Sequence, residues 1–190
     1  ASVIGLAAIS FGISNYFGMP LPVSIAVALI VGSLCGLLNA WVIHFSKIQP
    51  LVVTLGSLYL FQGAATVVSG LAGAGGYEGI GNFPEAFTGF GYAEFLGIPA
   101  PTLLFVAIAA VLIVLLHMTR FGRAVFLTGQ SESAARFSGI PVARVQTITY
   151  VITGLCAAIA GLALSAYFGS ARVDLGSATL LPAVTAAGLG

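Results

Sequence analysis

The sequence predicts an all-α fold: a polytopic helical bundle in a membrane, with about five membrane segments in one domain over residues 1–190. Hydrophobic residues make up 59% of the chain and charged residues only 6%, whereas soluble domains carry about 25% charged residues. Apolar stretches recur at close to the ~20 residues that a helix needs to cross the hydrocarbon core. Within them, small residues recur every four positions, as in helices that pack closely in lipid.

Four apolar stretches are expected to be full membrane helices joined by turns or polar connections. Two shorter apolar stretches, Ala1–Ile13 and Ser177–Gly190, are expected to belong to helices that continue outside the sequence, so the chain reads as an internal fragment of a longer protein. Pro22 stands at the start of the first full helix, where its missing N–H is harmless. The four full helices are Leu21–Phe45, Leu51–Val68, Thr102–His117 and Gln146–Tyr167.

The charged residues gather in the connections and set the expected topology. The stretch Thr119–Val145 carries four of the six basic residues, and basic connections stay in the cytoplasm during insertion. With this stretch inside, Ser46–Pro50 is also inside, while Ser69–Pro101 and Gly169–Gly176 are outside. The inside connections then hold five basic residues, and the outside connections hold only Arg172. The five are Lys47, Arg120, Arg123, Arg136 and Arg144.

Two of the expected helices carry faces of small residues. In the first, small residues recur every four positions from Ser24 to Ala40 and include the pair Gly32 and Gly36; in the last, Gly154 and Gly161 belong to a similar face. Small faces let helix backbones approach each other, and packing rather than the hydrophobic effect joins helices in lipid. We therefore expect these glycines to pack helix against helix.

Uncharged polar side chains within the helices are the candidate contacts for a transported solute. Such residues also form hydrogen bonds between helices, and that interpretation stays open for each of them. A pathway lined by hydroxyl and amide groups without charges would suit a neutral polyhydroxylated solute. The candidates are Asn39, Thr54, Ser57, Gln62, Thr149 and Thr153.

The middle of the basic stretch is expected to form a short helix over Ser131–Ser138. Ser131 can cap its first turn, Ala134 and Ala135 favour helix, and Gly139 before Ile-Pro ends it. This helix is either a solvated connector or a docking helix for a cytoplasmic partner.

Several classes of function are disfavoured by what the sequence lacks. There is no glycine-rich phosphate-binding motif, no set of residues for catalysis or metal binding, and no basic patch with interleaved aromatics for nucleic acid. Cys35 and Cys156 lie in apolar segments and are expected to be inert thiols. The expected membrane helices hold no Lys, Arg, Asp or Glu, which argues against a proton-coupled pump. A transport permease, a channel or secondary transporter, and a membrane scaffold remain possible; an enzyme is the weakest alternative, and no cofactor is expected.

Several motifs resemble the permease family of bacterial ABC importers for ribose and related sugars. That family shows T-x-x-G-R followed by G-x-N-x-x-A-A-x-x-S-G-I, and this chain has TRFGRAV at Thr119–Val125 and GQSESAARFSGIPV at Gly129–Val142. Further matches are GLLNA at Gly36–Ala40 and PLVVTLGSL at Pro50–Leu58. The segments GYEGIGNFP, FLTGQS and YFGSARVDLG resemble the branch of the family that imports autoinducer-2, at Gly76–Pro84, Phe126–Ser131 and Tyr167–Gly176.

The resemblance implies a fold of about ten helices, of which this chain is the middle, in the inner membrane of a bacterium. It implies import of autoinducer-2 or a similar sugar-like solute by a pair of permease subunits, identical or sister chains, with a cytoplasmic ATPase dimer and a periplasmic solute-binding protein as partners. The permease itself would hydrolyse no ATP. The family's coupling segment would lie within 119–145 and include Arg123, Glu132, Ala134, Ala135, Arg136 and Gly139.

Overall fold

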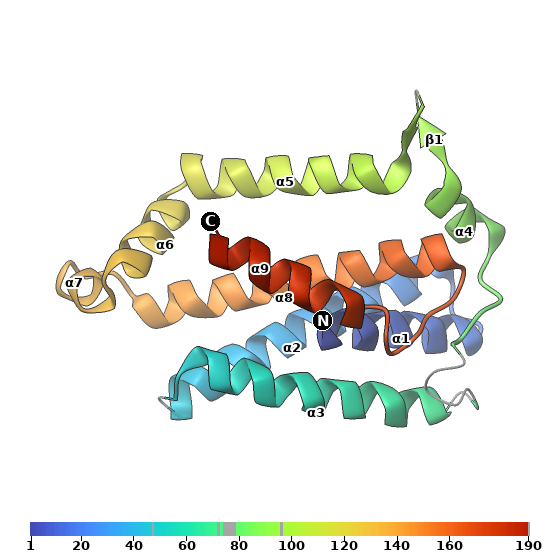
Figure 1. Cartoon of the computed structure of the whole chain (residues 1–190), viewed down its shortest axis with the longest axis horizontal. Coiled ribbons are helices and arrows are strands. Elements are labelled where there is room, and N and C mark those ends of the chain that lie inside the picture. Colours follow the sequence, from blue (N-terminus) through green and yellow to red (C-terminus); the bar gives the residue numbers. More distant parts are fainter. Residues whose placement is uncertain (47, 72, 74–78, 96, 190) are drawn as a thin grey trace.

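The structure, a computed structural model, describes residues 1–46, 48–71, 73, 79–95 and 97–189, and most of these residues form helices (Figure 1). The helices are α1 (Ser2–Tyr16), α2 (Leu21–Ser46), α3 (Pro50–Leu71), α4 (Glu85–Tyr92), α5 (Ala100–Met118), α6 (Arg120–Gln130), α7 (Glu132–Phe137), α8 (Val142–Phe168) and α9 (Leu180–Leu189). Two short strands, β1 (Glu94–Phe95) and β2 (Ile98–Pro99), form an antiparallel hairpin, and a 3₁₀ turn, η1 (Ser177–Thr179), precedes α9.

Four helices of the described chain, α2, α3, α5 and α8, are long and apolar enough to cross a membrane. They contain 26, 22, 19 and 27 residues, and a helix rises 1.5 Å per residue, so each covers close to or more than the ~30 Å of the hydrocarbon core. The predicted all-α membrane bundle is confirmed. The predicted number of about five segments is approximate, because α1 and α9 are shorter apolar helices of 15 and 10 residues.

The most extensive packing in the bundle joins α2 to α8, and their glycines lie in this contact. A Cβ atom on Gly32 would lie 2.6 Å from the Gly154 carbonyl oxygen and 2.6 Å from the Ala158 Cβ, and a Cβ on Gly36 would lie 2.9 Å from the Tyr150 carbonyl carbon. Real Cβ atoms do not approach other atoms so closely, so the two backbones meet at a distance that only glycine permits. The small face of α2 is buried along its whole length, at Ser24, Ala28, Gly32, Gly36 and Ala40.

Helix α1 packs against α2, α3 and α8 and forms the centre of the bundle with them. Gly161 of α8 lies against α1, since a Cβ there would be 2.6 Å from the Ile4 carbonyl oxygen. Phe11 of α1 is fully buried, and its ring centroid lies 4.3 Å from that of Phe87 and 5.1 Å from that of Phe83. The aromatic cluster therefore fixes the segment around α4 to the centre of the bundle.

The connection that follows α3 and the connection that follows α8 are joined by backbone hydrogen bonds. Ile80 and Ala171 form an antiparallel bridge in which each N–H donates to the other's carbonyl oxygen at 2.8 Å. Asn82 has a positive φ of 65°, a conformation that Asn tolerates better than most residues. The connection after α3 and the connection after α8 thus form one cap over the bundle.

The glycine contact between α2 and α8 gives a first prediction. Gly36→Ala should lower the thermal stability of the full-length protein in detergent, because the new methyl group meets the backbone of Tyr150 and Val151, and such overpacking typically costs about 1–3 kcal/mol. Gly63→Ala is the matched control, since a Cβ on Gly63 of α3 meets no atom within 4 Å. Equal unfolding temperatures for the two variants would contradict a close α2–α8 contact.

Candidate functional site

The candidate site lies where α6 and α7 connect α5 to α8, at one end of the bundle (Figure 1). Helix α7 is the outermost element at this end, beyond the ends of α3, α5 and α8. It begins after Ser131, whose hydroxyl accepts a hydrogen bond from the Ala134 N–H at 3.3 Å. The short helix expected from the sequence is therefore present, with Ser131 as its N-cap.

The C-terminal end of α7 is closed by a Schellman motif. Gly139 has a φ of +77°, its N–H donates to the Arg136 carbonyl oxygen at 3.0 Å, and the Ile140 N–H donates to the Ala135 carbonyl oxygen at 3.0 Å. This arrangement satisfies carbonyl groups that a helix end would otherwise leave unpaired, and it needs a residue that tolerates the left-handed conformation. Both ends of a helix of only six residues are thus fixed.

The four side chains of α7 expected to contact a partner do not all face outward. Ala135 is only 3% exposed and packs inward, whereas Ala134 is exposed. Glu132 and Arg136 are exposed and form an ion pair of 2.6 Å. An exposed pair of this kind contributes only ~0–1 kcal/mol, so it orients the two side chains more than it stabilises the helix.

Sequence analysis missed one residue of α7, Phe137, whose side chain is 94% exposed. From the sequence, an apolar residue near a helix end is expected to be buried in the core. Only the structure shows that this ring is almost wholly exposed. The available signal was its place within the segment that resembles the family's coupling motif.

Sequence analysis also missed α6, which occupies the first half of the basic stretch. Thr119 caps it by accepting a hydrogen bond from the Gly122 N–H at 3.2 Å, and Gly122 lies against the Leu116 carbonyl group of α5. Arg120 and Arg123 are exposed on its outer face. The cap and the apolar spacing within TRFGRAVFLTGQ could have indicated this helix, but its short length and two glycines concealed it.

A polar cavity of about 600 Å³ separates α7 from the connection between α2 and α3. It is bounded on one side by Glu132 and Arg136 and on the other by the C-terminal turn of α2 and the start of α3. Its polar lining residues are His44, Gln49, Glu132, Arg136 and Gln146. Because this space lies behind α7, the helix is supported mainly by α6 and α8 and not by α2 or α3.

The candidate solute contacts fall into separate places. Asn39 of α2 and Ser57 of α3 line the same cavity of about 410 Å³ between these helices. Thr153 lines a different cavity, of about 260 Å³, together with Thr149 and residues of α5 and α6. Thr54 and Gln62 are half-buried on α3 but are not among the lining residues of either cavity.

The hydroxyl groups among these candidates are bonded to their own helices. Thr54 donates to the Leu51 carbonyl oxygen at 3.0 Å, Ser57 to that of Thr54 at 3.0 Å, and Thr153 to that of Thr149 at 2.9 Å. A hydroxyl bonded in this way keeps its lone pairs as acceptors. Ser57 can therefore accept a hydrogen bond from a hydroxylated solute while the Asn39 amide can both donate and accept.

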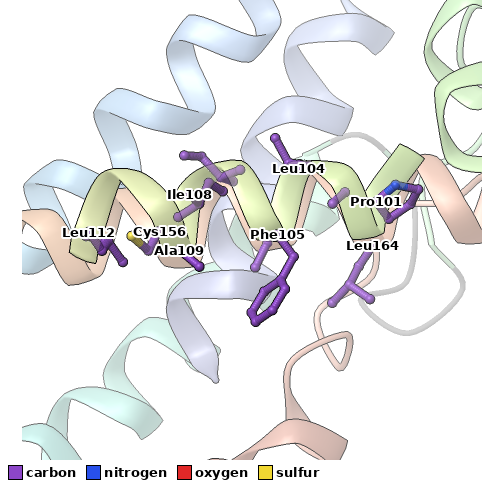
Figure 2. A pocket seen from close by; sticks show the side chains of 11 residues that line it. Pro101, Leu104, Phe105, Ile108, Ala109, Leu112, Cys156 and Leu164 are labelled. Carbon is purple, nitrogen blue, oxygen red and sulfur yellow. The ribbon is translucent and has the colours of Figure 1, made fainter. Parts of the chain in front are cut away.

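Another space, between α5 and α8, is apolar. This groove of about 470 Å³ is lined by side chains such as Leu104, Phe105 and Ile108 of α5 and Leu164 of α8, with the Cys156 thiol at its wall (Figure 2). It offers a hydroxylated solute almost no hydrogen-bonding partner. It suits hydrocarbon, in agreement with α5, which has no buried residue in its most apolar 18-residue window.

Charge divides the two ends of the bundle. The end that carries α6, α7 and the start of α8, called the basic end below, holds Arg120, Arg123, Arg136 and Arg144. At the opposite end the described charged residues are Glu85, Glu94 and the ion pair of Arg172 with Asp174, at 2.7 Å. Lys47 and Glu78, which also entered the predicted topology, lie outside the described residues.

Apolar spans joined by close glycine contacts, with charges kept to the two ends and uncharged polar groups between the helices, define a helical membrane domain. All 190 residues match the family described as the permease component of branched-chain amino acid transport systems, and the chain belongs to this family. The resemblance to importer permeases seen in the motifs is thereby confirmed.

Individual proteins of the family are also similar to the chain. The chain is 51% identical over 189 residues to the autoinducer 2 import system permease protein LsrD of Salmonella typhimurium and, equally, to LsrD of Escherichia coli strain K12. Each match covers 100% of this chain and 57% of the relative, so the chain spans little more than half the length of these proteins. No solved structure matches the chain.

The Schellman motif of α7 gives a second prediction. Gly139→Ala should destabilise α7 by about 1–2 kcal/mol, the cost of a left-handed residue that has a Cβ, without unfolding the bundle. Amide hydrogen exchange in 132–140 should then be roughly 5–30 times faster. Gly129→Ala is the control, because Gly129 is helical and a Cβ there meets no atom within 4 Å. Unchanged exchange in the Gly139 variant would show that the motif does not hold the helix.

Proposed function

We propose that the chain is the membrane-spanning part of an ABC importer permease that moves autoinducer-2, or a similar sugar-like solute, into the cytoplasm. The observation that carries this proposal is the 51% identity, over the whole chain, to permeases of autoinducer-2 import systems. The sequence holds no phosphate-binding motif, so ATP hydrolysis belongs to a separate subunit. The protein would be a multi-pass component of the bacterial inner membrane, with the basic end in the cytoplasm.

The proposed assembly contains four kinds of partner. Two permease subunits, identical or sister chains, would face each other in the lipid bilayer, and a pair of cytoplasmic ATPase subunits would bind the basic end. A periplasmic solute-binding protein would deliver the solute to the opposite end, where the cap formed by the Ile80–Ala171 bridge lies. Nucleic acid has no place in this assembly.

Helix α7 has the geometry of a coupling element in such an importer. It lies outermost at the basic end, is fixed at both ends, and is connected directly to α6 and α8. Because α8 meets α2 through backbone contacts at Gly32, Gly36 and Gly154, a displacement of α7 that reaches α8 moves α2 with it. Rigid-body movement of packed helices is a known route to alternating access.

The solute route is proposed to pass the cavity between α2 and α3. The wall of this cavity is mostly apolar, and Asn39 and Ser57 are its polar residues, which offer an amide and a hydroxyl oxygen without any charge. A neutral diol would form hydrogen bonds with both side chains, whereas the groove between α5 and α8, which is also mostly apolar, has only the Cys156 thiol among its lining side chains to offer.

The coupling role gives a third prediction. Ala134→Arg places a bulky charge on the exposed face of α7 without lowering helix propensity much. In the full-length permease it should abolish co-purification of the ATPase and reduce uptake of labelled autoinducer-2 at least tenfold, with normal amounts of protein in the membrane. Ala86→Arg, the same substitution at an exposed alanine of α4 at the opposite end, should leave co-purification unchanged. An Ala134→Arg variant that binds the ATPase and transports normally would make α7 a mere connector.

The solute route gives a fourth prediction. Asn39→Ala and Ser57→Ala should each raise the KM for autoinducer-2 uptake about fivefold, because loss of one hydrogen bond costs about 1 kcal/mol. Thr66→Ala removes a hydroxyl that is exposed on α3 and bonded to the Gln62 carbonyl oxygen, and it serves as the control. A KM that stays at the wild-type value in both cavity variants would exclude this route.

A further inference from the structure

We propose that Phe137 is the residue that fastens this permease to its ATPase, by inserting into an apolar pocket that is rimmed by carboxylates on the ATPase surface. This inference rests on the proposed function, because it assumes that an ATPase subunit binds the basic end. It adds the residue on which binding depends and the chemistry of the surface that receives it.

The first support is the unusual exposure of Phe137. Other large apolar side chains of the chain are exposed too, such as Phe45 at 78% and Met118 at 76%, but they belong to α2 and α5, which are long and apolar enough to lie in lipid. Phe137 is 94% exposed and belongs to α7, the outermost element of the basic end. In the proposed topology this end lies in the cytoplasm, so water surrounds the ring and burying it against a partner is favourable.

The second support is that the ring is held ready for contact. Its helix is capped by Ser131, closed by the Schellman motif at Gly139, and seated on the bundle through the buried Ala135. A partner that binds Phe137 therefore does not have to order the backbone around it. Binding to a pre-organised group loses less entropy than binding to a flexible one, and single aromatic anchors of this kind often dominate an interface.

The third support is the positive charge at the basic end, where the ring lies. Arg136 precedes Phe137 directly, and Arg120, Arg123 and Arg144 lie on the neighbouring helices α6 and α8. The described carboxylate at this end is that of Glu132, which already pairs with Arg136. The basic end, which bears Phe137, is therefore positive on balance, and the complementary partner surface is an apolar pocket with a negative rim.

The experiment measures binding of the separately purified ATPase subunit to the full-length permease in detergent. Phe137→Ala should weaken binding at least tenfold, which corresponds to 1.4 kcal/mol, and Phe137→Leu should weaken it less. Phe126→Ala, which removes a half-exposed ring of α6 that packs beside His117, is the matched control and should bind as the wild type does. Because Phe137 packs against so little, its variants should unfold at the wild-type temperature.

The outcomes separate this inference from the proposed function. If the wild-type permease binds no ATPase, the proposed function fails. If it binds and Phe137→Ala binds equally well, Phe137 is not the anchor, whereas the proposed function stands. The negative rim is tested by salt: association should slow between 50 and 500 mM NaCl, because screening shortens the reach of the charges, and a salt-independent rate would exclude the rim.

Discussion

The structure depends on the close approach of two helix backbones, those of α2 and α8. Lipid gives little hydrophobic driving force for helix association, so the bundle must be held by packing and by contacts between backbones. Gly32 and Gly36 of α2 and Gly154 of α8 supply that contact, and a single methyl group at any of them would meet backbone or Cβ atoms at less than 3.0 Å. Helix α1 joins the same unit through Gly161 and Phe11, which makes α1, α2 and α8 one packed group.

This packed group explains how a movement at one end of the protein could be transmitted to the other end. Helix α8 starts three residues after Gly139, where α7 closes, and ends at the connection that forms the Ile80–Ala171 bridge. In the proposed coupling, a force on α7 would reach the opposite end along one continuous helix of 27 residues. The four spans hold no acidic residue, and their one basic residue, Arg144, lies in the first turn of α8, so no charge in the middle of a span has to be moved or neutralised when the helices shift.

Much of this fold could be predicted from the sequence, because the membrane imposes simple rules. Span positions follow from length and hydropathy, the α2 face follows from a spacing of four, and Ser131 and Gly139 mark the ends of α7. What could not be predicted depends on three-dimensional neighbours: that α6 is a helix, that Ala135 is buried beside an exposed Ala134, and that Phe137 packs against nothing. For the same reason the sequence could name Asn39, Ser57 and Thr153 as candidates but not say which of them share a cavity, and the structure puts Thr153 in a separate one.

The two sides of α8 make different kinds of contact with the neighbouring helices. Toward α2 and α1 it presents glycines that fix the distance between backbones, while toward α5 it presents Ile159, Ala160 and Leu164 to an open apolar groove. Helix α5 is tied to the rest at its two ends, through α4 and the hairpin on one side and through α6 on the other. A shift of α5 and α6 along this groove changes only non-directional apolar contacts, which adjust at small cost, whereas a shift between α2 and α8 would force backbones into one another. Within this chain, α2 and α8 are joined by backbone contacts whereas α5 faces α8 across an apolar groove, and the segment that bears Phe137 connects α5 to α8.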